Sequence, residues 1–186
     1  MTDYFALLDQ PRVPWLDSDA LKEVFHTKTL ATHPDAGASG STNEFAELNE
    51  AYQVLQDPKR RLQHLLSLEG SPPSSAHQSV PSDLQDLFLR IGETTQHANG
   101  VLGKVRAASN ALGKSLLQKE IVSAREQVAS SQKSVRELHE AANEELRAIS
   151  SGWPAKIGEA SILHQRFAYL GRWTSQLDEL AFQLSL

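Results

Sequence analysis

The chain has 186 residues, of which 40% are hydrophobic and 22% are charged, and it contains no cysteine. This composition is ordinary for a globular protein. The lack of cysteine excludes disulfides, thiolate catalysis and any cysteine-held zinc or iron–sulfur centre within this chain. Residues 1–69 carry 11 acidic and 6 basic side chains, whereas residues 70–186 carry 12 of each. Because no basic face that could follow a phosphate backbone is expected, nucleic acid is not an expected partner.

Membrane segments and targeting signals are not expected either. The longest apolar runs are only a few residues, far short of the roughly 20 that a membrane-spanning helix needs. The first residues, MTDYFALLDQPRVPW, have neither the basic start and apolar core of a secretory signal nor the arginine-rich composition of a transit peptide. We therefore expect a cytoplasmic protein without a membrane partner.

The first long helix is expected over residues 16–32, after the short apolar segment DYFALL. Asp17 or Ser18 can cap its first turn, and apolar residues recur along it at helical spacing. The helix should end before Pro34, because the residue that precedes a proline avoids the α region.

Two more helices are expected before residue 70. The segment STNEFAELNEAYQVLQDP, residues 41–58, can be capped by Ser41 or Thr42, and one apolar stripe runs along it: Phe45, Leu48, Ala51, Tyr52 and Leu55. The segment KRRLQHLLSLEG, residues 59–70, predicts a shorter helix that ends at Gly70. Arg60 and Arg61 are expected to form its solvated first turn.

The helices over residues 16–32 and 41–58 should form an antiparallel hairpin, because only a loop of about eight residues joins them. Phe25 and Leu30 of the first helix would then be buried against the apolar stripe of the second. The tripeptide His33-Pro34-Asp35 falls at the exposed tip of the predicted hairpin.

A linker is predicted over residues 70–81. The sequence GSPPSSAHQSVP has three prolines, four serines, one glycine and no charge, a composition that does not continue a helix. We therefore expect one unit over residues 1–69 and another over residues 82–186.

Residues 82–186 predict a three-helix antiparallel bundle, because apolar residues recur there every seven positions. The first helix carries two predicted rows, one from Leu84 to Leu112 and one from Phe88 to Leu116; the second carries a row from Ile121 to Ile149, and the last carries Leu163, Leu170, Leu177 and Leu184.

The bundle turns are predicted from breaks in this pattern. The spacing changes phase beside Asn110 and Gly113, which indicates the first turn, with Asn99-Gly100 as the rival site. SSGWP ends the second helix, and Pro154 suits the first position of the third.

Two apolar groups in this unit have alternative interpretations. Leu84, Leu87, Phe88 and Ile91 form a face wider than a two-row seam, which is either bundle core or a groove for a client protein. Tyr169 and Trp173 lie one helical turn apart and are as consistent with a structural role as with client binding.

The order of motifs in the first unit resembles a J-domain. Over residues 3–66, DYFALL is followed by a helix, by His-Pro-Asp, and by F-x-x-L-N-x-A-Y-x-V-L-x-D-P on the next helix. The tripeptide alone would be a weak signal, but its position between these two helices makes the match specific. RRLQHLLSLEG, the proline-containing linker and a last helix with WPAKIGEASILHQRFAYLGRWTSQLDEL are similar to the HscB family, the J-domain co-chaperones of iron–sulfur cluster assembly.

The resemblance implies an all-α protein with an N-terminal J-domain hairpin and a C-terminal three-helix antiparallel bundle. It implies a co-chaperone, not itself an enzyme, that stimulates the ATPase of a DnaK/HscA-type chaperone and delivers a client, an iron–sulfur cluster scaffold protein. The residues implied in chaperone binding are His33, Pro34, Asp35, Lys22 and His26. The candidate client-binding residues are those of the two apolar groups described above: Leu84, Leu87, Phe88, Ile91, Tyr169 and Trp173.

Two other functions stay open on the sequence alone. The chain could be a J-domain adaptor that recruits the chaperone to an unrelated client, or a degenerate J-like fold with a scaffolding role. No cofactor is expected, and no metal site is expected because the seven histidines have no second ligand at a metal-binding spacing.

Overall fold

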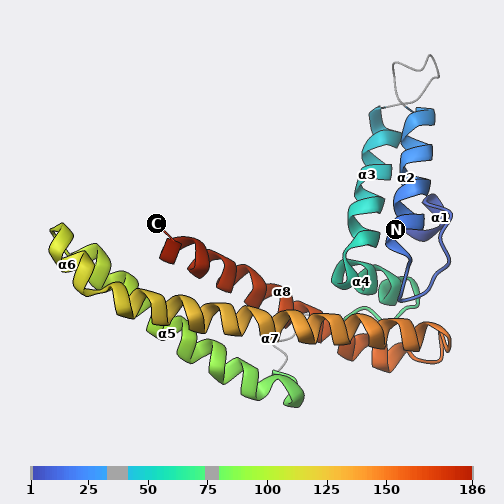
Figure 1. Ribbon diagram of the computed structural model, residues 1–186. Coiled ribbons are helices and arrows are strands. Elements are labelled where there is room, and N and C mark those ends of the chain that lie inside the picture. The colour runs from blue at the N-terminus through green and yellow to red at the C-terminus, as the bar shows by residue number, and fades with distance from the viewer. Residues whose placement is uncertain (1, 33–41, 74–79, 186) are drawn as a thin grey trace. The chain divides into compact units, whose positions relative to one another are not determined.

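The computed structural model describes residues 2–32, 42–73 and 80–185. Within these ranges every regular element is a helix (Figure 1), which confirms the predicted all-α fold. The elements are α1 (Tyr4–Leu7), α2 (Ser18–Thr32), α3 (Thr42–Gln56), α4 (Pro58–Leu68), the 3₁₀ turn η2 (Ser82–Leu84), α5 (Gln85–Ala107), α6 (Ala111–Leu116), α7 (Gln118–Ser150) and α8 (Ile157–Ser185). None of the helices in these ranges is long and apolar enough to cross a membrane.

The chain packs as two compact units. The first consists of residues 1–76 together with residues 143–165, and the second of residues 77–142 together with residues 166–186. The connection between α7 and α8 therefore packs with the N-terminal helices. Each unit is described by itself below.

Local sequence signals fix the helix ends of the first unit. The Asp17 carboxylate accepts hydrogen bonds from the backbone N–H groups of Asp19 and Ala20, both at 3.0 Å, so Asp17 is the cap of α2. Asp57 caps α4 in the same way, through the N–H of Arg60 at 2.7 Å. Both caps satisfy N–H groups that have no partner inside the helix.

The end of α4 lies where the sequence predicts it. Gly70 follows the C-cap with a φ of +72°, a left-handed conformation that costs glycine little and other residues more. The N–H of Ser71 donates to the carbonyl of Leu66 at 2.9 Å, the bond that completes this type of helix end. Gly70 is thus confirmed as the helix stop.

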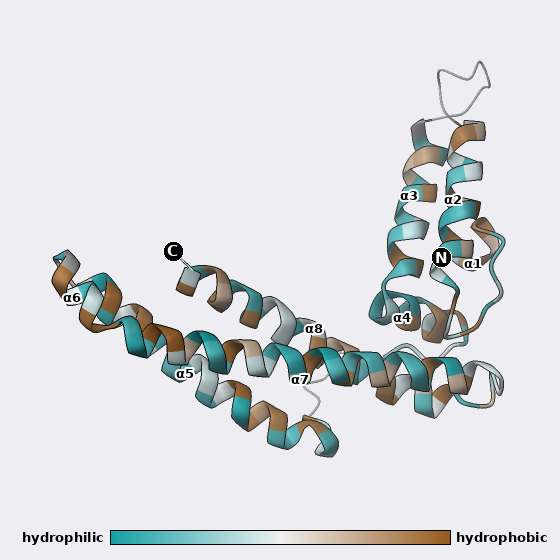
Figure 2. Ribbon diagram, viewed as in Figure 1, coloured by the Kyte–Doolittle hydropathy of each residue, from teal (hydrophilic) through white to brown (hydrophobic). Residues whose placement is uncertain are grey.

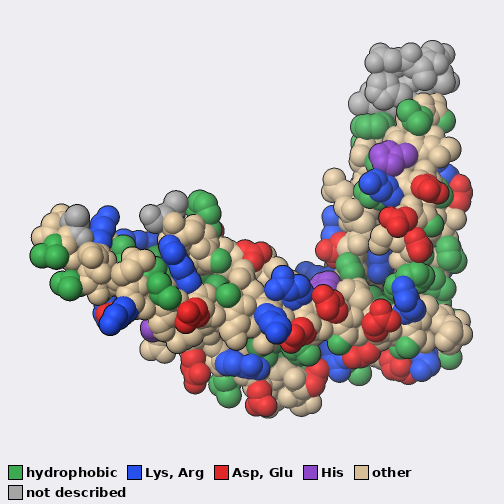
Figure 3. Space-filling model, viewed as in Figure 1, with side chains coloured by type: hydrophobic (Ala, Val, Ile, Leu, Met, Phe, Trp, Pro, Cys, Tyr) green, Lys and Arg blue, Asp and Glu red, His purple; other side chains and the backbone are tan. Residues whose placement is uncertain are grey.

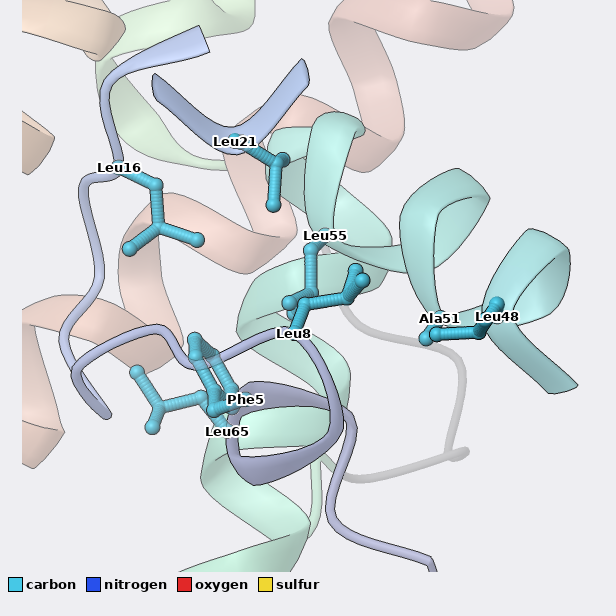
Figure 4. Close-up of a cluster of buried hydrophobic side chains, with 8 residues drawn as sticks. All are labelled: Phe5, Leu8, Leu16, Leu21, Leu48, Ala51, Leu55 and Leu65. Atoms are coloured by element: carbon cyan, nitrogen blue, oxygen red, sulfur yellow. The ribbon is translucent and has the colours of Figure 1, made fainter. Parts of the chain in front are cut away.

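The core of the first unit joins α1, α2, α3 and α4. Its buried members are Phe5, Leu8, Leu16, Leu21, Leu48, Ala51, Leu55 and Leu65 (Figure 4). Phe25 packs against this cluster and stacks on Tyr52 with ring centroids 4.3 Å apart. Leu30 contradicts the prediction, because its side chain is 73% exposed.

The residues that connect α7 to α8 pack against the N-terminal part of the first unit. Trp153 contacts the core cluster. The backbone N–H of Trp15 donates to the Ser150 hydroxyl at 2.8 Å, and the Arg147 guanidinium lies over the Trp15 ring at 4.5 Å. A hydrogen bond and a cation–π contact therefore hold the two sequence-distant parts of this unit together.

In the second unit, α5 lies parallel to the C-terminal part of α8 and antiparallel to α7. Asp83 pairs with Arg166 at 2.9 Å and Thr95 with Gln176 at 2.9 Å, so residue numbers rise together along α5 and α8. On α7 the numbers fall instead, since Thr94 bonds to Ser131 and Lys104 to Glu120. Hydrophobic and hydrophilic residues alternate along all three helices (Figure 2), as burial of one face requires.

Most predicted rows of the bundle are buried. Val128, Val135, Ala142 and Ile149 of α7 are buried, and so are Leu163, Leu170, Leu177 and Leu184 of α8. On α5 the second predicted row is only partly confirmed: Leu102 is buried, but Phe88 is exposed, and the buried residues Leu87, Thr94 and Val101 each lie one position before a predicted one. One residue is about 100° around a helix, so this shift moves Phe88 out of the seam.

The two bundle turns differ in how well the sequence predicts them. Asn110 caps α6 by accepting the N–H of Gly113 at 2.7 Å, which confirms the turn there, and the rival site Asn99-Gly100 lies inside α5. Pro154 is not the first residue of the last helix. The Trp153–Pro154 peptide bond is cis, the chain stays in a turn through residue 156, and α8 begins at Ile157.

Candidate functional site

The candidate site is the α2–α3 hairpin, whose helices pack side by side (Figure 1). His33, Pro34 and Asp35 belong to the connection between Thr32 and Thr42 and lie outside the described residues. The Phe25–Tyr52 stack joins the two helices of the hairpin. The tripeptide is therefore connected to two helices that are stabilised by contacts outside the connecting segment.

The predicted chaperone-binding residues on α2 are at the surface. Lys22 and His26 are both exposed, and their separation of four residues places them on one face of the helix. Lys28 is engaged differently: its ammonium pairs with Asp9 and donates to the carbonyl of Leu7, both at 2.8 Å. Lys22 and His26 are thus placed where a partner could reach them, while Lys28 fastens the α1 loop to α2.

A small cleft lies beside the ends of the hairpin. It has a volume of about 280 Å³ and is lined by Leu7, Lys28, Ala31, Glu44, Glu47 and Leu48. None of these residues is predicted as a site residue from the sequence. The signal that could have found them is position, because Ala31 and Glu44 flank the segment that carries the tripeptide.

Arg61, at the base of the domain, contradicts the predicted solvated role. It is only 5% exposed, and its guanidinium donates to the Pro14 carbonyl at 2.7 Å and the Leu55 carbonyl at 2.6 Å. Burial lowers the pKa of Arg61 to about 10, so the group stays charged at neutral pH. Arg60 is on the outside and pairs with Glu50 at 2.7 Å.

His64 attaches α1 to α4. Its Nε2 accepts the backbone N–H of Tyr4 at 3.1 Å, and its ring stacks on Tyr4 with centroids 4.5 Å apart. The bond requires a neutral ring with Nε2 unprotonated. Burial lowers the pKa of His64, with the nearby Asp3 carboxylate acting in the opposite direction, so burial favours the same neutral form.

The predicted client face divides into buried and exposed members. Leu84, Leu87 and Ile91 are buried in the bundle, which supports the core interpretation for these three and removes them from the surface. The reason is the position of the seam on α5, which takes in the predicted row Leu84, Ile91 and Ala98 together with Leu87, Thr94 and Val101. Phe88 is 48% exposed, and its neighbour Leu89 is 62% exposed.

Trp173 is buried, whereas Tyr169 is only partly covered. The Tyr169 ring lies 5.6 Å from the Trp173 ring, and the Arg172 guanidinium is 4.7 Å from its centroid. Because α5 and α8 run parallel, Phe88 and Tyr169 lie at similar levels along the bundle. Of the six predicted client-binding residues, these two keep exposed surface.

Within the described ranges, no group of three or more His, Asp or Glu side chains is arranged to hold a metal ion. What the first unit provides instead is a surface: a helical hairpin with two exposed cationic or titratable side chains and a polar tripeptide in its connecting segment.

Comparison with known proteins agrees with this arrangement. Residues 3–64 match the family model of the DnaJ domain. The chaperone protein DnaJ of Campylobacter hominis is 43% identical over 63 residues, covering 33% of this chain and 17% of the relative. A co-chaperone protein HscB homolog of Vibrio cholerae is 34% identical over 85 residues, covering 42% of this chain and 50% of the relative. The chain thus spans half or less of the length of these curated relatives.

Solved structures extend the likeness to the fold of the whole chain. The chaperone HscB from Vibrio cholerae matches with a TM-score of 0.58 and 20% identity, over 98% of this chain and 99% of that one. Human co-chaperone protein HscB matches with a TM-score of 0.51 and 19% identity, over 96% and 82%. Residues 3–64 are therefore a DnaJ domain, in a chain that resembles the HscB co-chaperones in sequence and shares their fold.

Proposed function

We propose that the protein is a co-chaperone that stimulates the ATPase of a DnaK-type chaperone through the segment His33-Pro34-Asp35. The observation that carries the proposal is the DnaJ-domain match over residues 3–64, with the tripeptide placed between two helices that pack together. The curated relatives over this region are named chaperones and co-chaperones.

The chemistry of the segment suits docking to a cationic surface of the chaperone. The Asp35 carboxylate can accept a charge-assisted, two-point hydrogen bond from an arginine of the chaperone. Pro34 restricts the backbone and so lowers the entropy lost on docking. His33 can orient the segment through its ring nitrogens, and the exposed Lys22 and His26 can donate hydrogen bonds to acidic groups elsewhere on the chaperone.

The test is steady-state ATP turnover by the DnaK-type chaperone of the same cell, measured with and without this protein. Asp35→Asn and His33→Gln should abolish the stimulation, because loss of a charge-assisted interface contact costs roughly 2–5 kcal/mol, more than a tenfold loss of docking. Lys22→Glu should weaken it in part.

Two matched control variants test whether a loss of stimulation comes from the lost docking contact or only from the change in charge. Asp86→Asn makes the same chemical change at an exposed position of α5, and Lys133→Glu repeats the charge reversal on an exposed part of α7. Both should stimulate like the unaltered protein. Full stimulation by Asp35→Asn, or equal losses in the controls, would refute the assigned role.

We further propose that the chaperone is of the HscA type and that the delivered client is an iron–sulfur cluster scaffold protein. The likeness to HscB in sequence and fold supports this. Phe88 and Tyr169 are the predicted client residues with exposed surface. The test is calorimetric titration with the scaffold protein of the same cell: Phe88→Ser should weaken binding, and Phe182→Ser, an equally apolar exposed change on α8, should not. Chaperone stimulation without any scaffold binding would favour an adaptor for an unrelated client.

A further inference from the structure

The end of the bundle that carries α6 contains an apolar groove. It has a volume of about 500 Å³, within the range of ligand-binding clefts. Its walls come from α5, α6, α7 and the last turn of α8 and include Leu102, Val105, Lys114, Ile121, Arg125 and Leu184. All of these residues belong to the second unit.

The last described turn of α8 forms one wall of the groove. Arg125 donates from Nε to the carbonyl of Leu184 at 2.8 Å, which places the end of α8 beside the second turn of α7. The hairpin continues past this level through α6 (Figure 1). The side chains of Val105 and Ile121, which line the groove, are only partly covered.

Two leucines beside the groove are strongly exposed. Leu112 is 71% exposed and Leu116 is 76% exposed, although both continue the apolar rows of the preceding helix in the sequence. Exposed leucines next to a partly open apolar groove are typical of a surface that a partner covers.

The charged side chains around the groove are mostly basic. Residues 101–119 contain Lys104, Arg106, Lys114 and Lys119 and no acidic residue, in a chain whose net charge is −5. Lys104 is paired with Glu120 at 2.6 Å. Lys114 and Lys119 have no ion-pair partner among the residues that the structure describes. Hydrophobic and basic side chains can be seen together at the α6 end of the bundle (Figure 3).

We propose that this groove, with its exposed leucines and lysines, is a docking surface for an acidic amphipathic helix of a partner protein. The apolar side chains of the helix would lie on Leu102, Val105 and Ile121. Its carboxylates would face the unpaired Lys114 and Lys119, which favours acidic over basic partners and speeds association.

A helix fits the observations better than an anionic membrane does. A membrane could accept the protruding Leu112 and Leu116 and attract the lysines, but a flat surface leaves the concave wall of the groove uncovered. A helix covers the groove floor, the leucines and the lysines at once. The surface is separate from the DnaJ domain in sequence, so its binding can be measured independently of the proposed ATPase stimulation.

The experiment uses the full chain and a fluorescein-labelled peptide of about 15 residues, with leucine at helical a and d spacing and glutamate elsewhere. Fluorescence anisotropy should show saturable binding. A peptide with lysine for glutamate and a peptide with the same composition but shuffled leucines should both bind at least about tenfold more weakly.

Variants of the protein locate the site. Lys114→Glu should weaken peptide binding about tenfold and Leu116→Ser about fivefold, whereas Lys133→Glu and Leu89→Ser, the same changes at exposed positions outside the groove, should leave it within about twofold. Circular dichroism melts verify that each variant is folded. Absence of saturable peptide binding, or equal effects of the groove and control variants, would overturn the proposal.

Two further outcomes would also overturn it by identifying another occupant. Binding to phosphatidylserine-containing vesicles that Lys114→Glu abolishes, with no peptide binding, would assign the surface to a membrane. Concentration-dependent self-association in sedimentation, abolished by Leu116→Ser, would assign it to a second copy of the chain.

Discussion

Replacement of Arg61 tests whether a buried cation holds the base of the DnaJ domain together. The Arg61 guanidinium is 5% exposed and donates to two carbonyls, of Pro14 and Leu55. Pro14 is far from Arg61 in the sequence, so this side chain connects α4 both to the segment before α2 and to the end of α3. Removing it leaves two buried carbonyl oxygens without these donors.

The magnitude follows from those two oxygens. An unsatisfied buried polar group costs about 1–3 kcal/mol, so Arg61→Met should lower the free energy of unfolding by about 3 kcal/mol, with part of the loss offset because a charge is no longer buried. Arg61→Lys should cost at least as much. The ammonium keeps the burial cost of a charge but lacks the planar fork that reaches both carbonyls at once.

The assay is urea denaturation followed by circular dichroism and by tryptophan fluorescence, to which Trp15, next to Pro14 in the chain, contributes. The matched control is Arg60→Met on the adjacent, outward-facing residue, whose exposed ion pair with Glu50 is worth about 0.5 kcal/mol. If Arg61→Met destabilised no more than Arg60→Met, or if Arg61→Lys were neutral, the inferred carbonyl bridge would be wrong.

The remaining predictions concern pH and the bundle core. Burial lowers the pKa of His64 below its ordinary value of 6.5. The neutral ring therefore contributes its full stability above about pH 6.5, and this contribution is lost as the pH falls toward the lowered pKa. Between pH 7.5 and 5.5 the melting temperature should fall less for His64→Gln than for the unaltered protein, and an equal fall in both would contradict this. Val135→Asp places a charge at a buried position of α7 and should lower the free energy of unfolding by roughly 3–5 kcal/mol. Val122→Asp, on the same helix but 42% exposed, should change the melting curve little. Similar effects of the two variants would show that the bundle seam lies elsewhere.

Features that depend on a few adjacent residues could be predicted from the sequence. Asp17 as a cap, Gly70 as a helix stop and the turn at Asn110 each follow from hydrogen bonds or φ angles confined to neighbouring residues. The leucine row of α8 from Leu163 to Leu184 could also be predicted, because a seven-residue spacing leaves one face for the seam whatever the partner helix is. The DnaJ domain was identifiable for the same reason, since its motif extends over two adjacent helices.

Features that depend on distant residues were decided only by the tertiary structure. Arg61 looks like a surface residue in its own helix, and it is buried because carbonyls from two other segments lie within reach of its guanidinium. Leu30 has an apolar side chain at helical spacing, yet it stays exposed because the core of the first unit is built from other positions.

The same distinction explains the candidate client face. Leu87 and Phe88 are adjacent apolar residues, and the sequence alone leaves open which of them faces the core. The contacts of α5 with α7 and α8 place Leu87 inside and leave Phe88 exposed. Because one residue turns a helix by about 100°, only the positions of the neighbouring helices determine which side chain remains available to a partner.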